Sequence, residues 1–368
     1  MARGLVRLHL PGPRGRLVAR GPGRGPRRAG PRRLGLRVLE GPARPLSRVM
    51  TTRLTHAATD LLGALSVSAR AEVSAAIEDP SWTRWSYLPG DRPGLSLEHA
   101  DPEMLGHVND LLARSHSELG VELVQGAIEV ERERRRSITG ETPSGDRYWL
   151  RVHGTPGGDG PWAWRLNGHH VGVHVVVDGE GFTATPHFIG SEPAHLTEGP
   201  LAGTRLLGRE EDLARELLAQ LSAGQREQAI SSGTAPDDIL SAMDPVVDPS
   251  VLPTGIRRAG LDASQRRTFD ALTRRYLDRL PTAYADACWE EAIDVGADEM
   301  AFAWAGSTKV GEGHYYCVTT PVFLIEYDNT QDGANHAHSV LRHLRDDFGG
   351  DALRRHHRDG HSPAALGT

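Results

Sequence analysis

The sequence predicts an α+β fold: an antiparallel β-sheet built from central hairpins and packed with N-terminal, middle and C-terminal helices. Two blocks of the 368-residue chain alternate polar and apolar residues, the pattern of half-buried strands. Apolar residues at helical spacing precede, separate and follow these blocks. Strands grouped in this way favour an antiparallel sheet over a regularly alternating, doubly wound fold. No internal repeat is visible in the sequence.

The N-terminal third is expected to be helical around one long loop. Helical spacing begins at Met50 and runs to about Ile77. The loop that follows, "DPSWTRWSYLPGDRPGLSLEHADPE", is rich in Pro, Gly and aromatic residues, which is typical of a functional loop. Two more helices are predicted over about 102–119 and 123–137, and the charged run "EVERERRR" in the second indicates a solvated face.

The middle of the chain carries the strands. "DRYWLRVHG", "WAWRLNGHHVGVHVVV" and "GFTATPHFIG" read as three strands, with "DGEG" as a hairpin turn. Amphipathic helices are predicted over about 208–230 and 261–280. A second hairpin is predicted in "MAFAWAGSTKVGEGHYYCVTTPVFLIEYDNT", and a His-rich helix from Asn335 to the C-terminus.

Composition narrows the class of protein. Residues 1–49, here called the basic head, contain thirteen Arg and one acidic residue. We interpret the basic head as disordered sequence translated from a start codon placed too early; the alternative is a disordered basic tail. Residues 50–368, predicted to be one domain, carry 29 basic and 47 acidic residues, a poor surface for nucleic acid. Two cysteines and no apolar run of about 20 residues predict a cytoplasmic protein without a membrane span.

Histidines in the first hairpin are candidate metal ligands. Alternation places His170 and His174 on one face of the sheet and His169 on the other. A turn of two or four residues adds His187 to the first face, whereas a three-residue turn does not. Three imidazoles with an open position form a catalytic zinc arrangement, although single histidines on a sheet are more often structural.

A second set of candidates lies in "FLIEYDNTQDGANHAHSVLRHL". Along the strand, Glu326 and Asp328 share one face. His336 and His338 follow; their rings share a side if the chain is extended and diverge by about 200° if it is helical. His356, His357 and His361 near the C-terminus are expected to be solvated, although His356 or His361 could close over a site.

Long motifs in this chain resemble the DUF3500 family. They are "PWAWRLNGHHVGVHVVV", "FTATPHFIGSEPA", "GHYYCVTTPVFLIEYDNTQDGANHAHSVLRHLRDDFGGDALRRHH" and the upstream "RWSYLPGDRPGLSL". The resemblance covers about 50–361 and implies no function, because the family is uncharacterised. It does favour the His169–His170 pair over His174 and His187, with one of the pair at the site and the other bracing the sheet. It also singles out Asp328, His336 and most of the residues to which the next paragraph assigns a role in catalysis or substrate binding.

The leading hypothesis is a metal-assisted enzyme of the hydrolase type that acts on a small molecule. A divalent metal, zinc ahead of iron or copper, is expected at His169, His170, His336 and His338. Catalysis is assigned to Glu326, Asp328, His338 and Arg342, and substrate binding to Arg84, Trp85, Tyr87 and Arg92. Two alternatives remain: a non-catalytic protein that binds an anionic small molecule, and a metal-free acid–base enzyme in which a carboxylate orients a histidine.

Overall fold

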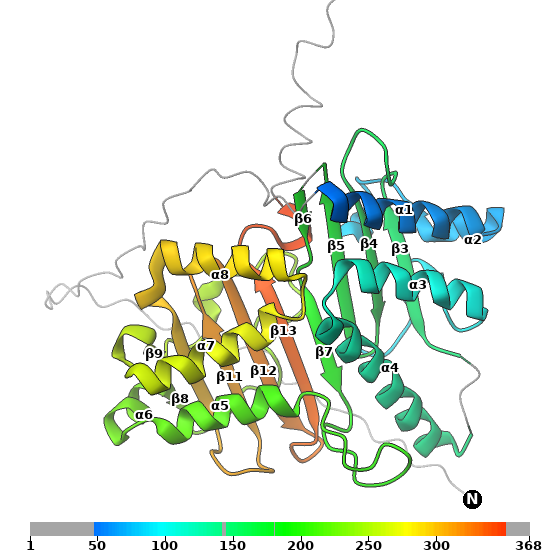
Figure 1. Ribbon diagram of the computed structural model, residues 1–368. Coiled ribbons are helices and arrows are strands. Elements are labelled where there is room, and N and C mark those ends of the chain that lie inside the picture. Colours follow the sequence, from blue (N-terminus) through cyan, green and yellow to red (C-terminus); the bar gives the residue numbers. More distant parts are fainter. Residues whose placement is uncertain (1–47, 142–144, 180, 351–368) are drawn as a thin grey trace, which may run out of the picture. The chain divides into compact units, whose positions relative to one another are not determined.

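The computed structural model describes residues 48–141, 145–179 and 181–350 (Figure 1). The described residues all belong to one compact unit. The predictions for the basic head up to residue 47, and for His356, His357 and His361, lie outside the described residues.

The helices lie in two groups of four along the sequence. The second and third predicted helices are separated at His116–Ser117, where the Ser117 side chain caps the N-terminus of the next helix. Gly120 therefore lies inside that helix. The predicted helix 208–230 is two helices, and the last helix was not predicted at all. Their bounds are α1 Arg48–Ala64, α2 Val67–Val73, α3 Pro102–Ser115, α4 Glu118–Thr139, α5 Gly208–Gln220, α6 Ala223–Ala229, α7 Ala263–Leu277 and α8 Thr282–Gly296.

The strands form one sheet, in the order β1-β3-β4-β5-β7-β13-β12-β11-β10-β8, and it is mostly antiparallel. The predicted α+β class is therefore confirmed. The strands on this path are β1 Ser74–Ala75, β3 Tyr148–His153, β4 Trp162–Gly168, β5 Val171–Asp178, β7 His187–Ser191, β8 Ile230–Ser232, β10 Ala301–Gly306, β11 His314–Thr319, β12 Phe323–Gln331 and β13 His336–His343. Three short strands pair beside it: β2 Leu95–Ser96, β6 Gly181–Thr183 and β9 Ile256–Arg257. Short 3₁₀ turns lie at Pro80–Trp82, Pro249–Val251, Arg258–Gly260, Ala297–Glu299 and Asp347–Gly349.

The order of elements repeats. Two helices, a short strand, a 3₁₀ turn, a second short strand, two helices and a run of antiparallel strands occur in each half of the described chain. The sheet order reads the same from both edges: β1 is parallel to β3 as β8 is to β10, and β7 meets β13 antiparallel at the centre. The described residues thus form two structural repeats related by an approximate twofold axis, a feature that the sequence pattern did not reveal.

The two faces of the sheet are covered differently. Figure 1 shows the helices in front of one face, here called the helix face, where the large apolar core contains residues such as Leu166, Val173 and Leu341. The other face, here called the loop face, is covered by irregular segments that supply Trp82, Trp85 and Tyr87 and, from the second repeat, Ile239 and Leu240.

Three predictions of strand geometry were wrong. The stretch read as one strand over 162–177 is two strands, because Gly168 pairs with Val171 and His169–His170 forms the turn. Residues 336–343 form strand β13, not a helix, since pairing with β7 and β12 in the middle of the sheet outweighs the local helical pattern.

The third error concerns register. The hairpin turn between β5 and β6 has two residues, as expected. However, β6 and β7 pair with β5 in registers that differ by one residue: Val176 pairs with Thr183 of β6, whereas Val173 pairs with His187 of β7. A shift of one residue moves a side chain to the other face of the sheet. His187 therefore lies on the helix face and His174 on the loop face, so the predicted three-histidine face does not exist.

Candidate metal centre

The turn between β4 and β5 brings two histidine rings together. His170 has a φ of 64°, in the left-handed region, and its peptide groups are held on both sides: its N–H donates to the Tyr87 carbonyl (3.3 Å) and its carbonyl accepts from the Gly190 N–H (2.8 Å). The Tyr148 hydroxyl donates to the His169 carbonyl (3.1 Å). The two rings stack with centroids 3.7 Å apart. They do not point to opposite faces, as strand alternation suggested, because a turn does not alternate.

The start of β13 lies against this turn. His338 is paired with Gly190 of β7, and the His170 ring lies over that glycine. A Cβ at Gly190 would come within 2.5 Å of the His170 Cδ2 atom, so only glycine leaves room for the ring. The His336 N–H donates to the Asn329 side chain (3.1 Å), which holds this end of β13 onto β12.

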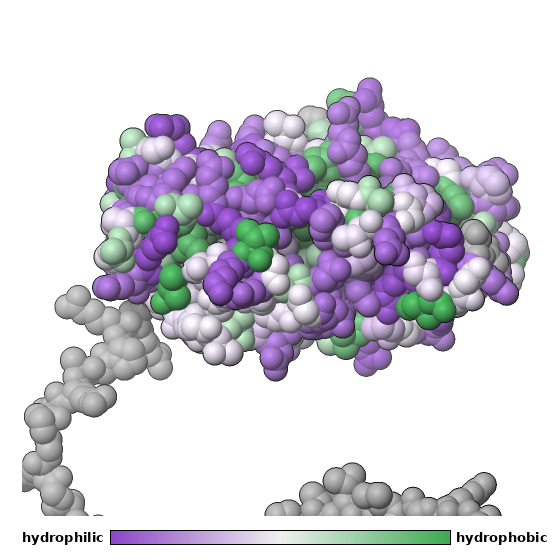
Figure 2. Space-filling model, turned by 90° about the horizontal axis from the view of Figure 1, so that it is seen from below, coloured by the Kyte–Doolittle hydropathy of each residue, from purple (hydrophilic) through white to green (hydrophobic). Residues whose placement is uncertain are grey.

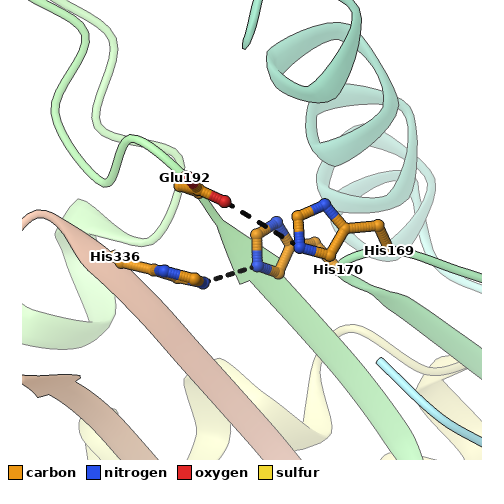
Figure 3. A group of neighbouring side chains, drawn as sticks. All are labelled: His169, His170, Glu192 and His336. Carbon is orange, nitrogen blue, oxygen red and sulfur yellow. Dashed lines mark hydrogen bonds and ion pairs between the residues drawn. The ribbon is translucent and has the colours of Figure 1, made fainter. Parts of the chain in front are cut away.

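Four side chains converge at this point and could hold a metal ion (Figure 3). They are His169 and His170 of the turn, Glu192 after β7, and His336 of β13, and one potential ligand atom from each lies within 4.8 Å of the others. The Nε2 atoms of His170 and His336 are 2.8 Å apart, and the His169 Nε2 is 3.9 Å from Glu192 Oε2. Neighbouring ligands of a tetrahedral zinc ion lie about 3.3 Å apart, so small side-chain movements would admit an ion.

Carboxylates hold the Nδ1 atoms of three histidines in and beside this cluster. Glu131 of α4 lies 2.8 Å from His169 Nδ1, and Asp332 lies 2.9 Å from His336 Nδ1. His338, next to the cluster, has Asp238 at 2.7 Å from its Nδ1. A carboxylate on Nδ1 fixes the tautomer that offers Nε2 as a ligand and raises its basicity, an arrangement typical of metal-bound histidines.

The electrostatics favour neutral rings. Burial lowers the pKa of His170 well below its usual value, and the neighbouring imidazoles of His169, His338 and His336 lower it further. Burial also lowers the pKa of His336, against the opposing effect of Asp332. Neutral imidazole is the form that binds metals.

His338 forms a second functional group beside the cluster. Its ring centroid is 4.7 Å from that of His336 and 5.3 Å from that of His170. Asp238, which orients His338, also accepts a hydrogen bond from the Tyr87 hydroxyl (3.0 Å). A histidine oriented by a carboxylate in this way can take up and release a proton during catalysis.

Glu326, predicted to be catalytic, holds the loop that carries Asp238. Its carboxylate accepts the backbone N–H groups of Leu240 (2.6 Å) and Ser241 (3.0 Å) and the Tyr315 hydroxyl (2.8 Å). The side chain is fully buried, and burial raises its pKa. Glu326 thus helps to position the segment that carries Asp238, and it is not part of the cluster.

Asp328 lies opposite His338 on β12. Its Oδ1 accepts from the Thr330 hydroxyl (2.8 Å), whereas its buried Oδ2 has no hydrogen-bond partner among the described residues. Burial raises the pKa of Asp328 to about 7, with Asp238 and Glu326 adding to the effect. The protonation of this carboxyl, next to His338, therefore changes around neutral pH.

The arginines predicted to bind substrate or to act in catalysis have no bond to the four side chains of the cluster among the described residues. Arg92 donates to the carbonyls of its own loop, including Ser86 and Gly90, and Arg84 is exposed. Arg342 is buried, forms an ion pair with Asp347 and lies over the Trp85 ring. Of the four residues assigned to substrate binding, only Tyr87 is bonded, among the described residues, to a group at the site, through its hydrogen bond to Asp238.

Sequence reasoning missed four carboxylates: Glu131, Glu192, Asp238 and Asp332. Asp332 stands four residues before His336 in a polar turn, a spacing that could have marked it as a partner. Glu131 belongs to the charged run that was read as a solvated face, and Asp238 lies in a long irregular connection. Their roles depend on contacts between distant segments, which no local pattern shows.

Comparison with protein-family models shows a match over residues 47–350 to the family described as "Protein of unknown function (DUF3500)". The chain belongs to the DUF3500 family. Neither a curated protein nor a solved structure matches this DUF3500 chain. None of its described helices is long and apolar enough to cross a membrane.

Proposed function

We propose that this DUF3500 protein is a metal-dependent hydrolase whose ion is held by His169, His170, Glu192 and His336. The observation that carries the proposal is the convergence of these four side chains from both structural repeats, with carboxylates on the Nδ1 atoms of His169 and His336. Three histidines and a carboxylate suit zinc, with iron and copper as alternatives.

A divalent ion held by these four side chains would lower the pKa of a bound water and polarise the bond to be cleaved. His338 takes the proton of the attacking water and passes it to the leaving group, and Asp238 holds the ring in the required tautomer. Tyr87 donates a hydrogen bond to Asp238, and Glu326 of β12 holds the segment that follows Asp238 through the Leu240 N–H.

Backbone conformation gives independent support. Among the described residues, five other than glycine have positive φ, and three of them lie at the cluster: His170 (64°), Asp332 (49°) and Ala334 (63°). Such conformations cost of order 1–3 kcal/mol each and are concentrated at functional sites. The turn that contains Asp332 and Ala334 directs the Asp332 carboxylate back onto His336.

The site lies where β4 and β7 end and β13 begins, at the lower end of the sheet in Figure 1. Figure 2 views the protein from that side, and the surface there is largely hydrophilic with scattered apolar residues. Glu192 and Asp332 are partly exposed, with 22% and 63% of their side-chain surface accessible. These exposures support access of water and a small substrate to the ion.

The test is the metal content of untagged protein purified without added metal, measured by mass spectrometry. We expect about one equivalent per chain, a His170→Ala variant that retains less than a tenth of it, and metal-dependent hydrolysis of an activated ester. The control is His195→Ala, because His195 is an exposed histidine close to Asn335 but outside the cluster. Equal metal content in wild type and His170→Ala, or hydrolysis that persists after chelation, contradicts the proposal.

Metal-free acid–base catalysis is the second candidate, favoured by the His338–Asp238–Tyr87 chain, which is complete without an ion. The same measurement separates the two. Metal-free catalysis predicts activity that is insensitive to chelators, lost in His338→Ala and retained in His170→Ala.

A further inference from the structure

The charges around the cluster are unbalanced. Four carboxylates surround it: Glu131, Glu192, Asp238 and Asp332. The one guanidinium bonded to them, among the described residues, belongs to Arg134, which lies 2.7 Å from Glu192 and 3.5 Å from Glu131. A divalent ion and Arg134 together carry three positive charges, so a loaded site with neutral histidines still has a net charge of −1.

Arg134 is not free to bind a substrate anion. Its Nε faces Glu192 and its Nη1 faces Glu131, and the two carboxylates flank His169. Each carboxylate that Arg134 contacts also contacts His169, so Arg134, Glu131, His169 and Glu192 form a closed ring of polar contacts. Releasing this guanidinium for a substrate would leave two carboxylates of the site without a cation.

Arg342, expected to act in catalysis, and Arg92, expected to bind substrate, have other partners as well. Arg342 bonds Asp347 and the Asp244 carbonyl (2.7 Å), and Arg92 bonds carbonyls of its own loop. The chain outside the basic head is also acidic, with 29 basic and 47 acidic residues over 50–368. A surplus of negative charge repels anions both at the site and during their approach.

We infer that the site accepts an uncharged carboxylic ester or amide and discriminates against phosphate esters and other substrates with an anionic group beside the scissile bond. This inference rests on the proposed metal-dependent hydrolysis. The oxygen of water forms a bond to the carbonyl carbon, and the bond from that carbon to the leaving oxygen or nitrogen breaks. His338 takes one proton from the water and delivers it to the leaving alcohol or amine, so the products are a carboxylic acid and that alcohol or amine.

The test compares two probes of equal size, 4-carbamoylphenyl acetate and 4-carboxyphenyl acetate, with the zinc-loaded full-length protein. They differ by one negative charge. We expect kcat/KM to be at least ten-fold higher for the uncharged probe, and the preference to shrink as NaCl is raised because salt screens the repulsion. Equal kcat/KM values, or faster hydrolysis of the anionic probe, overturn the inference.

A second arm needs no catalysis. The cobalt-loaded protein is titrated with inorganic phosphate and with neutral imidazole, and the visible absorption of the ion is followed. We expect imidazole to change the spectrum at concentrations at least ten-fold lower than phosphate, and tighter binding of phosphate overturns the inference. If neither ester probe is hydrolysed but the cobalt-loaded protein still prefers imidazole to phosphate, the hydrolase proposal is contradicted while the charge selectivity remains supported.

Discussion

Two pairs of histidines in this protein lie on opposite faces of the same sheet. His170 and His336 lie at the cluster, with ring centroids 4.8 Å apart, and His116 and His187 lie on the helix face, with centroids 5.3 Å apart. All four rings are buried, and burial lowers the pKa in each case. Burial and proximity therefore do not distinguish a candidate site from the core.

The difference lies in what surrounds the rings. His336 has a carboxylate on Nδ1 and directs Nε2 towards His170, with Glu192 close by. His187 has no hydrogen-bond partner on either ring nitrogen among the described residues, and the same is true of Nε2 of His116. A metal site is therefore indicated by ring nitrogens that carboxylates hold in a fixed orientation, and not by the clustering of imidazoles alone.

The largest expected effect is the loss of one ligand. Apparent binding free energies of structural zinc are about 10–16 kcal/mol, so one of four ligands contributes about 3–4 kcal/mol. We expect His336→Ala to weaken zinc binding by about 100- to 1,000-fold, measured by competition with a chromophoric chelator. His187→Leu is the matched control and should bind zinc as wild type does. A loss of affinity in His187→Leu as large as in His336→Ala would remove the distinction between the pairs.

The second effect concerns stability against pH. Burial lowers the pKa of His116 from 6.5 to about 4. Below pH 6.5 the unfolded chain binds a proton that the folded chain excludes, so the free energy of unfolding falls as the pH drops from 6.5 towards 4. One such group contributes up to about 3 kcal/mol.

We expect His116→Leu to reduce this pH dependence in urea unfolding experiments between pH 4 and pH 7. The variant and the wild type should differ in slope below pH 6.5 and run parallel above it. Parallel curves across the whole range would show that His116 is not held neutral in the folded state.

The next effect tests the carboxylates that orient the rings. Removal of such a partner typically costs 10- to 100-fold in metal affinity. We expect this loss for Glu131→Gln and for Asp332→Asn, with a melting temperature of the metal-free Asp332→Asn protein close to wild type because the Asp332 side chain is exposed. Glu133→Gln, on the same helix as Glu131 but paired with Arg136, is the control. Zinc affinities unchanged in both site variants would show that the carboxylates do not support the ligands.

The smallest effect comes from the glycine beneath His170. In Gly190→Ala the new methyl group would meet the His170 ring at 2.5 Å and the Ala337 carbonyl at 3.1 Å. We expect the ring to shift and zinc affinity to fall by about ten-fold, of the order seen when support around a site is disturbed. Gly106→Ala in α3 has no atom within 4 Å of the new Cβ and should leave affinity unchanged. Equal affinities in the two variants would show that His170 is not positioned by Gly190.

The sequence predicted the parts of the fold that depend on local pattern. Alternation located β3, β5 and β12, with Glu326 and Asp328 on one face, and helical spacing located most of the helices. β13 was misread because its sequence, "HAHSVLRH", has a weak strand pattern and becomes a strand only between β7 and β12. The repeat of the two halves escaped notice because it resides in the order of elements.

The candidate site was predicted in part. The structure brings together His169, His170 and His336, which the sequence had singled out, and places His338 beside them. The register of β7 could not be foreseen, because it changes by one residue between β6 and β7, and this removed His187 from the site. Asp332 lies four residues before His336, but the other two carboxylates that orient histidines, Glu131 of α4 and Asp238 in the connection before α7, are more than thirty residues from any ligand, so only the folded chain reveals them.

X-ray absorption at the zinc edge of the zinc-loaded protein tests the central claim most directly. The account predicts three imidazole nitrogens, one carboxylate oxygen and one water oxygen around the ion, at about 2.0–2.2 Å, and two imidazoles in the His170→Ala variant. A shell of oxygen atoms with no imidazole scattering, or an identical spectrum in His170→Ala, would contradict it.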